Sequence, residues 1–212
     1  MQRICYLSVI FSAAVAAGQS LSGQPTVSVP GAGPARTVAA FVPQHLFQDE
    51  EFEPAVRAMG KAGIQVIICS DETTAAVSTG RLFIKPSLSL RDVRPEDFGG
   101  LVIFGGPGGT LYWNDSTLLT TVRSFHRAGR LVAAIGAMPI VLANAGVVVG
   151  RRVTACRDSA AVKRIRGAGA RYSFRGVEVD GNLVTAMDWH HSRDFGRAVA
   201  KALHVRLNKG RF

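Results

Sequence analysis

A strand-to-helix junction near residue 136 has the layout that usually presents a nucleophile, yet it carries none. Leu131 to Ile135 is a short, continuous apolar run, typical of a strand buried on both faces. Gly136, Ala137 and Met138 follow, and an apolar, helix-like stretch begins at Ile140. In α/β enzymes a sharp turn of this kind holds a strained serine or cysteine above the sheet. Gly136 permits the unusual dihedrals but brings no reactive side chain, so the residues predict a scaffold without its usual chemistry.

Two cysteines are candidates for thiol chemistry elsewhere, since cleavage of an N-terminal leader would remove Cys5. Cys156 follows the strand-like pair Val153-Thr154 and has arginines on both sides, and positive charge lowers the pKa of a thiol. One interpretation is therefore an activated nucleophile, and the other is a small buried hydrophobic residue. Cys69 ends an apolar run, where core filling is expected. In an oxidising compartment the two could pair, but sequence spacing does not establish a disulfide.

Histidines near the last predicted helix could add acid–base or metal chemistry. His190 and His191 follow Asp188, and adjacent side chains point apart on a strand or helix, so sharing one metal needs an irregular turn. Without a third ligand at a recognisable spacing, we predict no metal and no cofactor. A pH-sensitive role for His190 and a structural polar pair are the alternatives. His45, beside the first strand, is a further candidate.

The segments that must position these residues alternate between strand and helix. Short apolar runs predict buried strands at Thr37 to Val42, Ile64 to Cys69, Gly100 to Phe104 and Leu131 to Ile135. Helical spacing predicts helices from Asp49 to Ala62, from Ser116 (as cap) to His126, from Asp158 to Ile165 and from Ser192 to His204. Hairpins are predicted within Thr74 to Leu90 and at Asp180-Gly181, and a helical turn at Pro95 to Phe98. This alternation predicts a mainly parallel sheet covered on both faces, with ligands at the carboxyl ends of its strands.

Composition indicates one compact domain with an excess of positive charge. The 212 residues are 47% hydrophobic and 19% charged, with a formal net charge of +10. Much of that charge lies in one stretch with Asp158 as its only acid: Arg151, Arg152, Arg157, Lys163, Arg164, Arg166, Arg171 and Arg175. This stretch is either a solvated basic face or a weak contact site for an anionic surface, through Arg151, Arg152, Arg157 and Arg164. Because no aromatic residues are expected between the charges to stack on bases, sequence-specific nucleic-acid recognition is not predicted.

The N-terminus predicts export. Residues 1–18 combine Arg3, an apolar run and small residues near Ala16 to Gly18 where a signal peptide would be cleaved. The apolar run is shorter than the roughly 20 residues that span a membrane, and an uncleaved anchor is the alternative. We expect a linker at 19–36, the domain at 37–207, a tail at 208–212, and a periplasmic or secreted location.

Several segments in a fixed order resemble a known superfamily. They are Phe47 to Glu51, Ala62 to Val66, Pro95 to Phe98, Leu101 to Gly106, Val132 to Pro139, Ala143 to Gly146, Gly150 to Thr154 and Asp180 to Thr185. Together they resemble the PfpI/DJ-1 superfamily, class I glutamine amidotransferase-like domains that include proteases, deglycases, glyoxalases and chaperones. The resemblance covers Thr37 to Leu203. It implies a flavodoxin-like three-layer α/β/α sandwich and a homo-oligomer.

The resemblance also implies a site from which the reactive residues are missing. Catalytic members carry Ile-Cys-His-Gly-Pro or Ile-Cys-Ala-Gly-Pro at the turn, where this chain has Ile-Gly-Ala-Met-Pro. Glu51 matches the acid that bonds the missing cysteine, and Gln48 replaces a second acid. Gly105 and Gly106 match a glycine pair whose amides can hold an oxyanion. The implied pocket lining is Glu51, Gly105, Gly106, Gly136, Ala137, Met138 and Cys156.

Two classes of function follow from these residues. The first is an exported domain without thiol catalysis at the turn that binds a small ligand or a protein partner, as a chaperone-like protein would. The second is a hydrolase or aldehyde-acting enzyme with relocated residues such as Cys156 with Glu51. A buried Glu51 without its thiol partner should have a raised pKa and could donate to a bound carbonyl or act as a general acid. Alternatively, it simply bonds the backbone near a helix start.

Overall fold

A computed structural model describes residues 34–209 of the chain. The predicted leader, most of the predicted linker and residues 210–212 of the predicted tail lie outside the described residues. Within residues 34–209, no helix has both the length and the apolar character needed to cross a membrane.

A seven-stranded sheet forms the centre of the domain, in the order β11-β12-β8-β7-β1-β3-β6. Its strands are β1 (Thr37–Phe41), β3 (Gln65–Ser70), β6 (Leu88–Ser89), β7 (Gly100–Ile103), β8 (Leu131–Ile135), β11 (Val177–Asp180) and β12 (Leu183–Ala186). Neighbouring strands run parallel, except the hairpin of β11 and β12. Every residue of β1, β7 and β8 is buried, which explains their unbroken apolar sequences.

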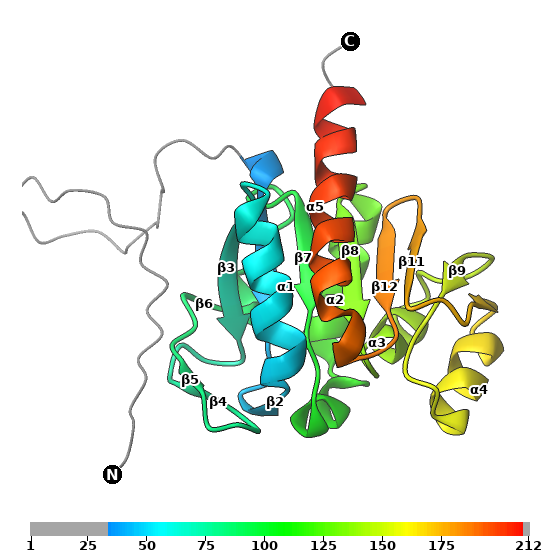
Figure 1. Ribbon diagram of the computed structural model, residues 1–212, viewed down its shortest axis with the longest axis horizontal. Coiled ribbons are helices and arrows are strands. Elements are labelled where there is room, and N and C mark those ends of the chain that lie inside the picture. Colours follow the sequence, from blue (N-terminus) through cyan, green and yellow to red (C-terminus); the bar gives the residue numbers. More distant parts are fainter. Residues whose placement is uncertain (1–33, 210–212) are drawn as a thin grey trace, which may run out of the picture.

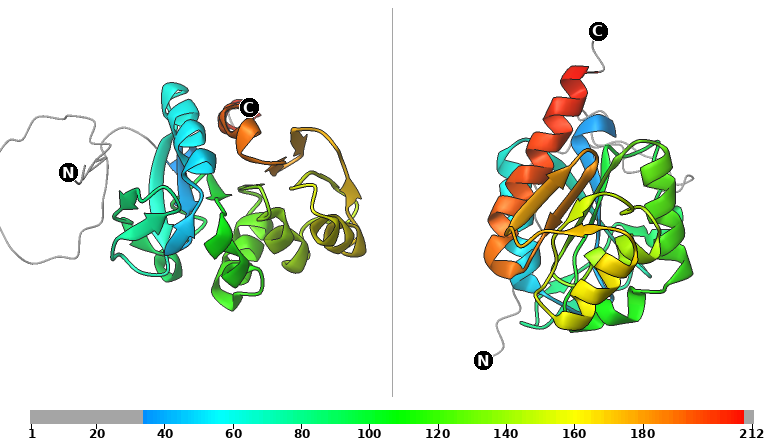
Figure 2. Two further views of the ribbon diagram at one scale, coloured as in Figure 1. Left: turned by 60° about the horizontal axis from the view of Figure 1, so that its bottom comes forward. Right: turned by 90° about the vertical axis from the view of Figure 1, so that its right-hand side faces the viewer.

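Helices cover both faces of this sheet (Figures 1 and 2). One face carries α1 (Asp49–Lys61) and α5 (Ser192–Lys209), and the other carries α2 (Ser116–Arg127) and α3 (Pro139–Asn144). Two separate hydrophobic clusters fill the spaces between the layers. The predicted three-layer fold with a mainly parallel sheet is therefore confirmed.

The end of the molecule beyond β11 carries a smaller unit (Figure 1, right). Here α4 (Ser159–Gly167) follows β9 (Arg152–Val153), which pairs in parallel with β10 (Arg171–Tyr172). The Asp158 side chain accepts hydrogen bonds from Ala160 N and Ala161 N and so caps α4, as its position in the sequence indicates.

Several predicted elements differ from those observed. The first hairpin, β4 (Ala76–Ser78) with β5 (Phe83–Ile84), joins β2 (His45–Phe47) in a separate small sheet instead of extending the main one. The predicted helical turn at residues 95–98 is instead a single turn closed by the hydrogen bond from Asp97 N to Arg94 O, and the nearby 3₁₀ helix is at Leu90–Asp92. Such short elements depend on what packs against them more than on local propensity.

Helix and domain ends also shift from their predicted positions. Asp115, not Ser116, caps α2, because its Oδ1 accepts from Leu118 N at 2.7 Å. Pro34–Arg36, assigned to the linker, forms a 3₁₀ turn. The last helix continues to Lys209, past the predicted boundary at residue 207. These are shifts of a few residues at element ends, where the apolar pattern carries little information.

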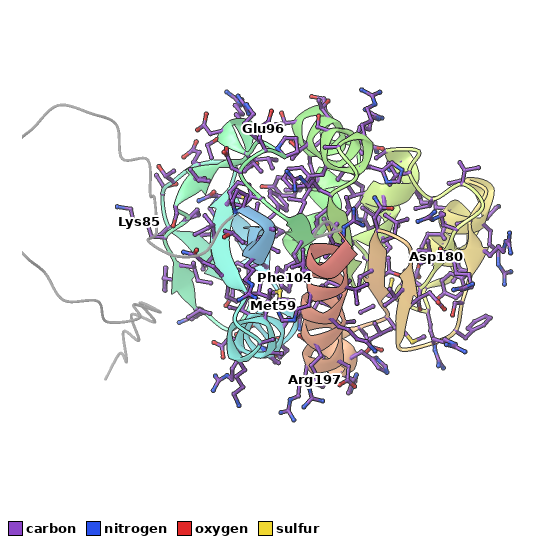
Figure 3. All side chains as sticks on the ribbon, turned by 90° about the horizontal axis from the view of Figure 1, so that it is seen from above. Met59, Lys85, Glu96, Phe104, Asp180 and Arg197 are labelled. Carbon is purple, nitrogen blue, oxygen red and sulfur yellow. The ribbon has the colours of Figure 1, made fainter. Side chains whose placement is uncertain are left out.

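The contact between α1 and α5 fixes the position of Glu51 relative to the sheet. Ser192 Oγ donates a hydrogen bond to the main-chain oxygen of Glu51. The ring of Phe104 packs edge-on against Phe52 of α1, with centroids 5.3 Å apart, and against Phe195 of α5 at 6.2 Å. Figure 3 shows Phe104 and Met59 in this region between the two helices. The helices meet so closely that a Cβ at Gly196 would overlap the main-chain oxygen of Ala55.

Gly196→Ala should therefore weaken the fold at this helix contact. The added methyl cannot fit without separating the helices, so we expect the free energy of unfolding to fall by about 2 kcal/mol. The measurement is chemical denaturation. Gly60→Ala is the matched control, because it is also a helical glycine but has nothing within 4 Å of an added Cβ. It should stabilise the protein by about 0.5–1 kcal/mol, and equal effects at both glycines would contradict the close approach at Gly196.

Candidate functional site

The turn after β8 is held by backbone hydrogen bonds from two neighbouring segments. Gly136 adopts a φ of 68°, in the left-handed region that favours glycine. Its N–H donates to the Ala186 oxygen at 3.0 Å, and its oxygen accepts from Cys156 N at 2.8 Å. The turn is thereby fixed between the end of β12 and the segment after β9, and it leads directly into α3.

The Glu51 carboxyl group fills the space where a side chain at residue 136 would begin. A Cβ built on Gly136 would overlap Glu51 Oε1. Glu51 Oε2 accepts a hydrogen bond from Gly105 N at 3.1 Å, and the residue is only 7% exposed. Although Glu51 lies in the first turn of α1, its carboxyl group bonds the loop after β7 and not its own helix. The same carboxyl group hydrogen-bonds the backbone of Gly105 and lies against the turn at Gly136, so the structural role and the site role expected for Glu51 do not exclude each other.

Burial gives Glu51 an unusual acidity. Loss of solvation raises the pKa of its carboxyl group from 4.5 to about 7, against the lowering effect of the Gly105 N–H. The negative charges of Asp188 and Glu50 raise the pKa further. A carboxyl group with this pKa exists in both protonation states near neutral pH. It can therefore donate a hydrogen bond to a carbonyl oxygen or transfer a proton.

Of the two glycine amides implied to hold an oxyanion, one already donates a hydrogen bond within the protein. Gly105 N already donates to Glu51. Within residues 34–209, neither Gly106 N nor Ala137 N has a hydrogen-bond acceptor. Gly106 directly follows Gly105 in the loop after β7, and Ala137 directly follows Gly136 in the turn after β8. Two backbone donors and one buried carboxyl group are what this arrangement offers to a ligand.

Cys156 lies beside the turn, but its environment disfavours a thiolate. Its backbone N–H bonds the Gly136 oxygen. Burial raises the pKa of its thiol, the Asp158 N–H lowers it, and the charges of Asp158, Glu51 and Asp188 raise it. The prediction that neighbouring arginines lower this pKa is therefore wrong in direction.

The physical reason is that the arginines are engaged elsewhere. Arg151 contacts Asp180 at 3.6 Å, Arg152 contacts Glu178 at 3.1 Å, and Arg157 Nε donates to Met187 Sδ at 3.2 Å. Sequence proximity places positive charges near Cys156, but their guanidinium groups point to other partners.

Cys69 has the expected role of core filling. It is fully buried in β3, and burial raises the pKa of its thiol to about 12. Both cysteines are free. Three strand steps separate β3 from β8, about 14 Å at the usual strand spacing, which is too far for a disulfide between Cys69 and a residue beside Gly136. The possible pairing of Cys69 with Cys156 is excluded in this fold.

His190 and His191 both contact Asp188 and not the turn at Gly136. A 3₁₀ turn at Trp189–His191 brings both rings toward one carboxylate, with His191 Nδ1 at 2.8 Å and His190 Nδ1 at 3.4 Å from Asp188 Oδ1. His190 is exposed and stacks on Trp189, with ring centroids 3.6 Å apart. In residues 34–209, no group of three His, Cys, Asp or Glu residues is arranged to hold a metal ion.

The remaining candidates lie outside the space around Gly136. His45 is exposed in β2, and the Gln48 amide donates to Glu50 at 2.7 Å on the surface. A groove of about 680 Å³ runs along α1 and α5 and is lined by Asp49, Glu50, Glu53, Pro54, Trp189, His190, Arg193, Asp194 and Arg197. None of the residues implied to line the pocket borders it.

Asp188 and Ser192 were not recognised as parts of this site from the sequence. Asp188 acts electrostatically on both Glu51 and Cys156, and Ser192 holds the main chain of Glu51. The only sequence signal was their place directly after β12, at the carboxyl edge of the sheet. The implied lining is otherwise brought together, since Met138 packs over Gly105, whose Cβ would lie 2.8 Å from Met138 Cγ.

Gly136→Ala should measure how fully Glu51 occupies the turn. We expect it to lower the free energy of unfolding by about 3 kcal/mol, through the left-handed backbone and the displaced, hydrogen-bonded carboxyl group. In a Glu51→Ala background the space is vacated, and the loss should fall to about 1 kcal/mol. Glu51→Gln keeps an atom in that space and should leave the full loss. An equal loss in all three backgrounds, measured by denaturation, would contradict the overlap.

The raised pKa of Glu51 predicts a pH dependence of stability. Between pH 4.5 and about 7 the folded protein keeps a proton that the unfolded chain has released. The free energy of unfolding should therefore fall as pH rises through this window, by up to about 3 kcal/mol relative to Glu51→Gln. Glu96→Gln, at an exposed carboxyl group, controls for loss of one acid. Parallel pH profiles for the wild type and Glu51→Gln would show that burial does not shift this group.

Comparison with known proteins identifies the relatives of this chain. A family model described as the DJ-1/PfpI family matches residues 36–202. An uncharacterized protein of Methanocaldococcus jannaschii is 35% identical over 80% of this chain and 82% of its own length. Protein/nucleic acid deglycase 2 of Escherichia coli is 30% identical over 66% of this chain and 82% of its own.

Solved structures agree with this assignment. The ThiJ/PfpI domain protein from Brachyspira murdochii superposes with a TM-score of 0.78 at 26% identity, over 82% of this chain and 99% of the other. DJ-1beta of Drosophila melanogaster superposes with a TM-score of 0.71 at 27% identity, over 79% and 90%. Because the family model and these relatives match most of its length, the chain belongs to the DJ-1/PfpI family.

Proposed function

We propose that this chain is a binding member of the DJ-1/PfpI family that works without thiol chemistry at the turn after β8. Its ligand carries a carbonyl group, which accepts a hydrogen bond from the protonated carboxyl group of Glu51. The observation that carries the proposal is that Glu51 Oε1 occupies the space of the missing side chain at Gly136. The group at the centre of the site is thus an acid with a pKa of about 7 and not a nucleophile.

Two backbone amides support this choice of ligand. Gly106 N and Ala137 N lack acceptors among residues 34–209, and they belong to the residues that follow Gly105 and Gly136, which the carboxyl group contacts. An oxygen of the ligand would satisfy donors that the fold leaves open. A small molecule with a carbonyl group fits this donor set. A protein partner, as in chaperone-like binding, would offer the same oxygen from its main chain.

An enzyme that uses Cys156 is the alternative. Its favourable observation is position, because Cys156 N bonds the oxygen of Gly136 and the thiol is therefore near Glu51. Its unfavourable observation is acidity, because burial and three neighbouring acids raise the pKa of the thiol. A protonated thiol is a weak nucleophile, so the binding function is preferred. Export is a further part of the proposal and rests on the leader-like composition of residues 1–18 alone.

Titration with small carbonyl compounds tests this function. We would record amide NMR spectra of the protein with pyruvate, acetone and acetamide as probes. At least one should shift the Gly106 and Ala137 signals saturably. If only the protonated form of Glu51 binds, the apparent Kd should rise by roughly 30-fold from pH 5.5 to pH 8.5, which is the ratio of protonated fractions for a pKa of about 7.

Variants at two positions separate the proposal from its alternative. Glu51→Gln keeps a donor and should bind with little pH dependence, whereas Glu51→Ala should not bind. Absence of saturable shifts with all three probes would contradict the proposal. Consumption of an aldehyde substrate such as methylglyoxal, abolished in Cys156→Ser and reduced in Glu51→Ala, would instead establish an enzyme with a relocated thiol.

A further inference from the structure

The basic stretch after residue 150 divides into paired and unpaired charges. Arg151 and Arg152 form ion pairs with the acids of the β11 hairpin, Asp180 and Glu178. The remaining cations are exposed and form no ion pair with any described side chain: Arg157, Lys163, Arg164, Arg166, Arg171 and Arg175. The one acid among them, Asp158, is occupied in capping α4. Arg151 and Arg152, which were expected to contact an anionic surface, are thus paired with acids of the protein, and the other six cations form a basic surface without paired acids among the described residues.

Apolar side chains protrude from this same surface. Phe174 is 62% exposed and lies between Arg171 and Arg175 in the chain. The Phe174 ring packs edge-on against the Tyr172 ring, with centroids 5.1 Å apart. The Arg166 guanidinium lies over the Tyr172 ring, 5.9 Å from its centroid. The expectation that no aromatic residues separate these charges is therefore wrong, because strand β10 and the loop after it place two aromatic rings among the arginines.

A second exposed apolar residue lies near the C-terminal end of α4. Val149 is 68% exposed, and the position of a Cβ on Gly169, just after the helix, lies 3.5 Å from Val149 Cγ1. Figure 2 (right) faces the end of the molecule that carries α4, β9 and β11, and Figure 3 marks it with Asp180. We call the surface formed by Lys163, Arg166, Arg171, Phe174, Arg175 and Val149 the α4 end.

We propose that the α4 end docks on a membrane surface that contains anionic lipids. Unpaired lysine and arginine side chains supply attraction to the headgroups, and Phe174 and Val149 enter the boundary between headgroups and acyl chains. This combination of clustered cations and protruding apolar side chains is the pattern that peripheral membrane contact requires. The inference does not use Glu51 and does not depend on the proposed ligand.

Lipid fits this surface better than single-stranded nucleic acid. Base stacking needs open aromatic faces, and one face of the Tyr172 ring is covered by Arg166 while Phe174 packs on its edge. One of the two protruding side chains, Val149, is aliphatic and offers nothing to stack on. An acyl boundary accepts both residues equally well.

Vesicle co-sedimentation of the full chain tests the proposal. Vesicles of phosphatidylcholine with phosphatidylglycerol should bind the protein, more weakly at high salt. The triple variant Lys163→Gln, Arg171→Gln, Arg175→Gln should bind roughly 100-fold more weakly, as expected for three charges near an anionic surface. Phe174→Ser should weaken binding by roughly 10-fold, with less change in the salt dependence.

A matched control removes three exposed charges away from the α4 end, two from α1 and one next to edge strand β6. Arg57→Gln, Lys61→Gln, Arg91→Gln has the same net charge as the test variant but leaves the α4 end intact. It should bind within roughly threefold of the wild type. Since all variants share residues 1–33, any contribution of the N-terminal apolar run is common to them. Equal binding of the two triple variants would overturn the proposal, and so would binding of oligo(dT) through these residues without binding of vesicles.

Discussion

The contact between the Glu51 carboxyl group and the backbone of Gly105 and Gly136 is the interaction on which the site depends. Because residue 136 carries no side chain, the carboxyl oxygen lies in the volume where one would begin. The contact uses one amide of the glycine pair and leaves the next one free. It also sets the acidity of the group, since the same burial that excludes water raises the carboxyl pKa to about 7. The filled space at Gly136, the amide that remains free and the raised pKa of Glu51 thus all result from this one contact.

The rest of the domain keeps that carboxyl group in place. Glu51 is in the first turn of α1, and its main-chain oxygen is bonded by Ser192 at the start of α5. The two helices approach each other at Gly196 and share Phe104 of the sheet as a packing partner. A buried acid is unfavourable when charged, so it persists only where its surroundings are fixed by such packing. The helix pair therefore serves the site as much as the core.

The sequence predicted the fold well because continuous apolar runs leave few alternatives for β1, β7 and β8. It also predicted the raised acidity of Glu51, from burial without a thiol partner. It could not predict that Gly105 N is already occupied, or that Arg151 and Arg152 turn away from Cys156. Those outcomes depend on where guanidinium groups and amides point across distant segments, and no local pattern encodes such directions.

Loss of a nucleophile at residue 136 changes the kind of group that meets a ligand and not merely its reactivity. A thiolate attacks and forms a bond, whereas a carboxyl group with a pKa near neutrality donates or accepts a proton and releases its partner unchanged. Burial, and after it the charges of Asp188 and Glu50, favours the protonated form of Glu51. Burial also raises the pKa of the neighbouring Cys156 thiol, and the charges of Asp158, Glu51 and Asp188 add to this. Below pH 7 neutral donors therefore prevail around Gly136, and a neutral donor set is selective for uncharged carbonyl oxygens over cations.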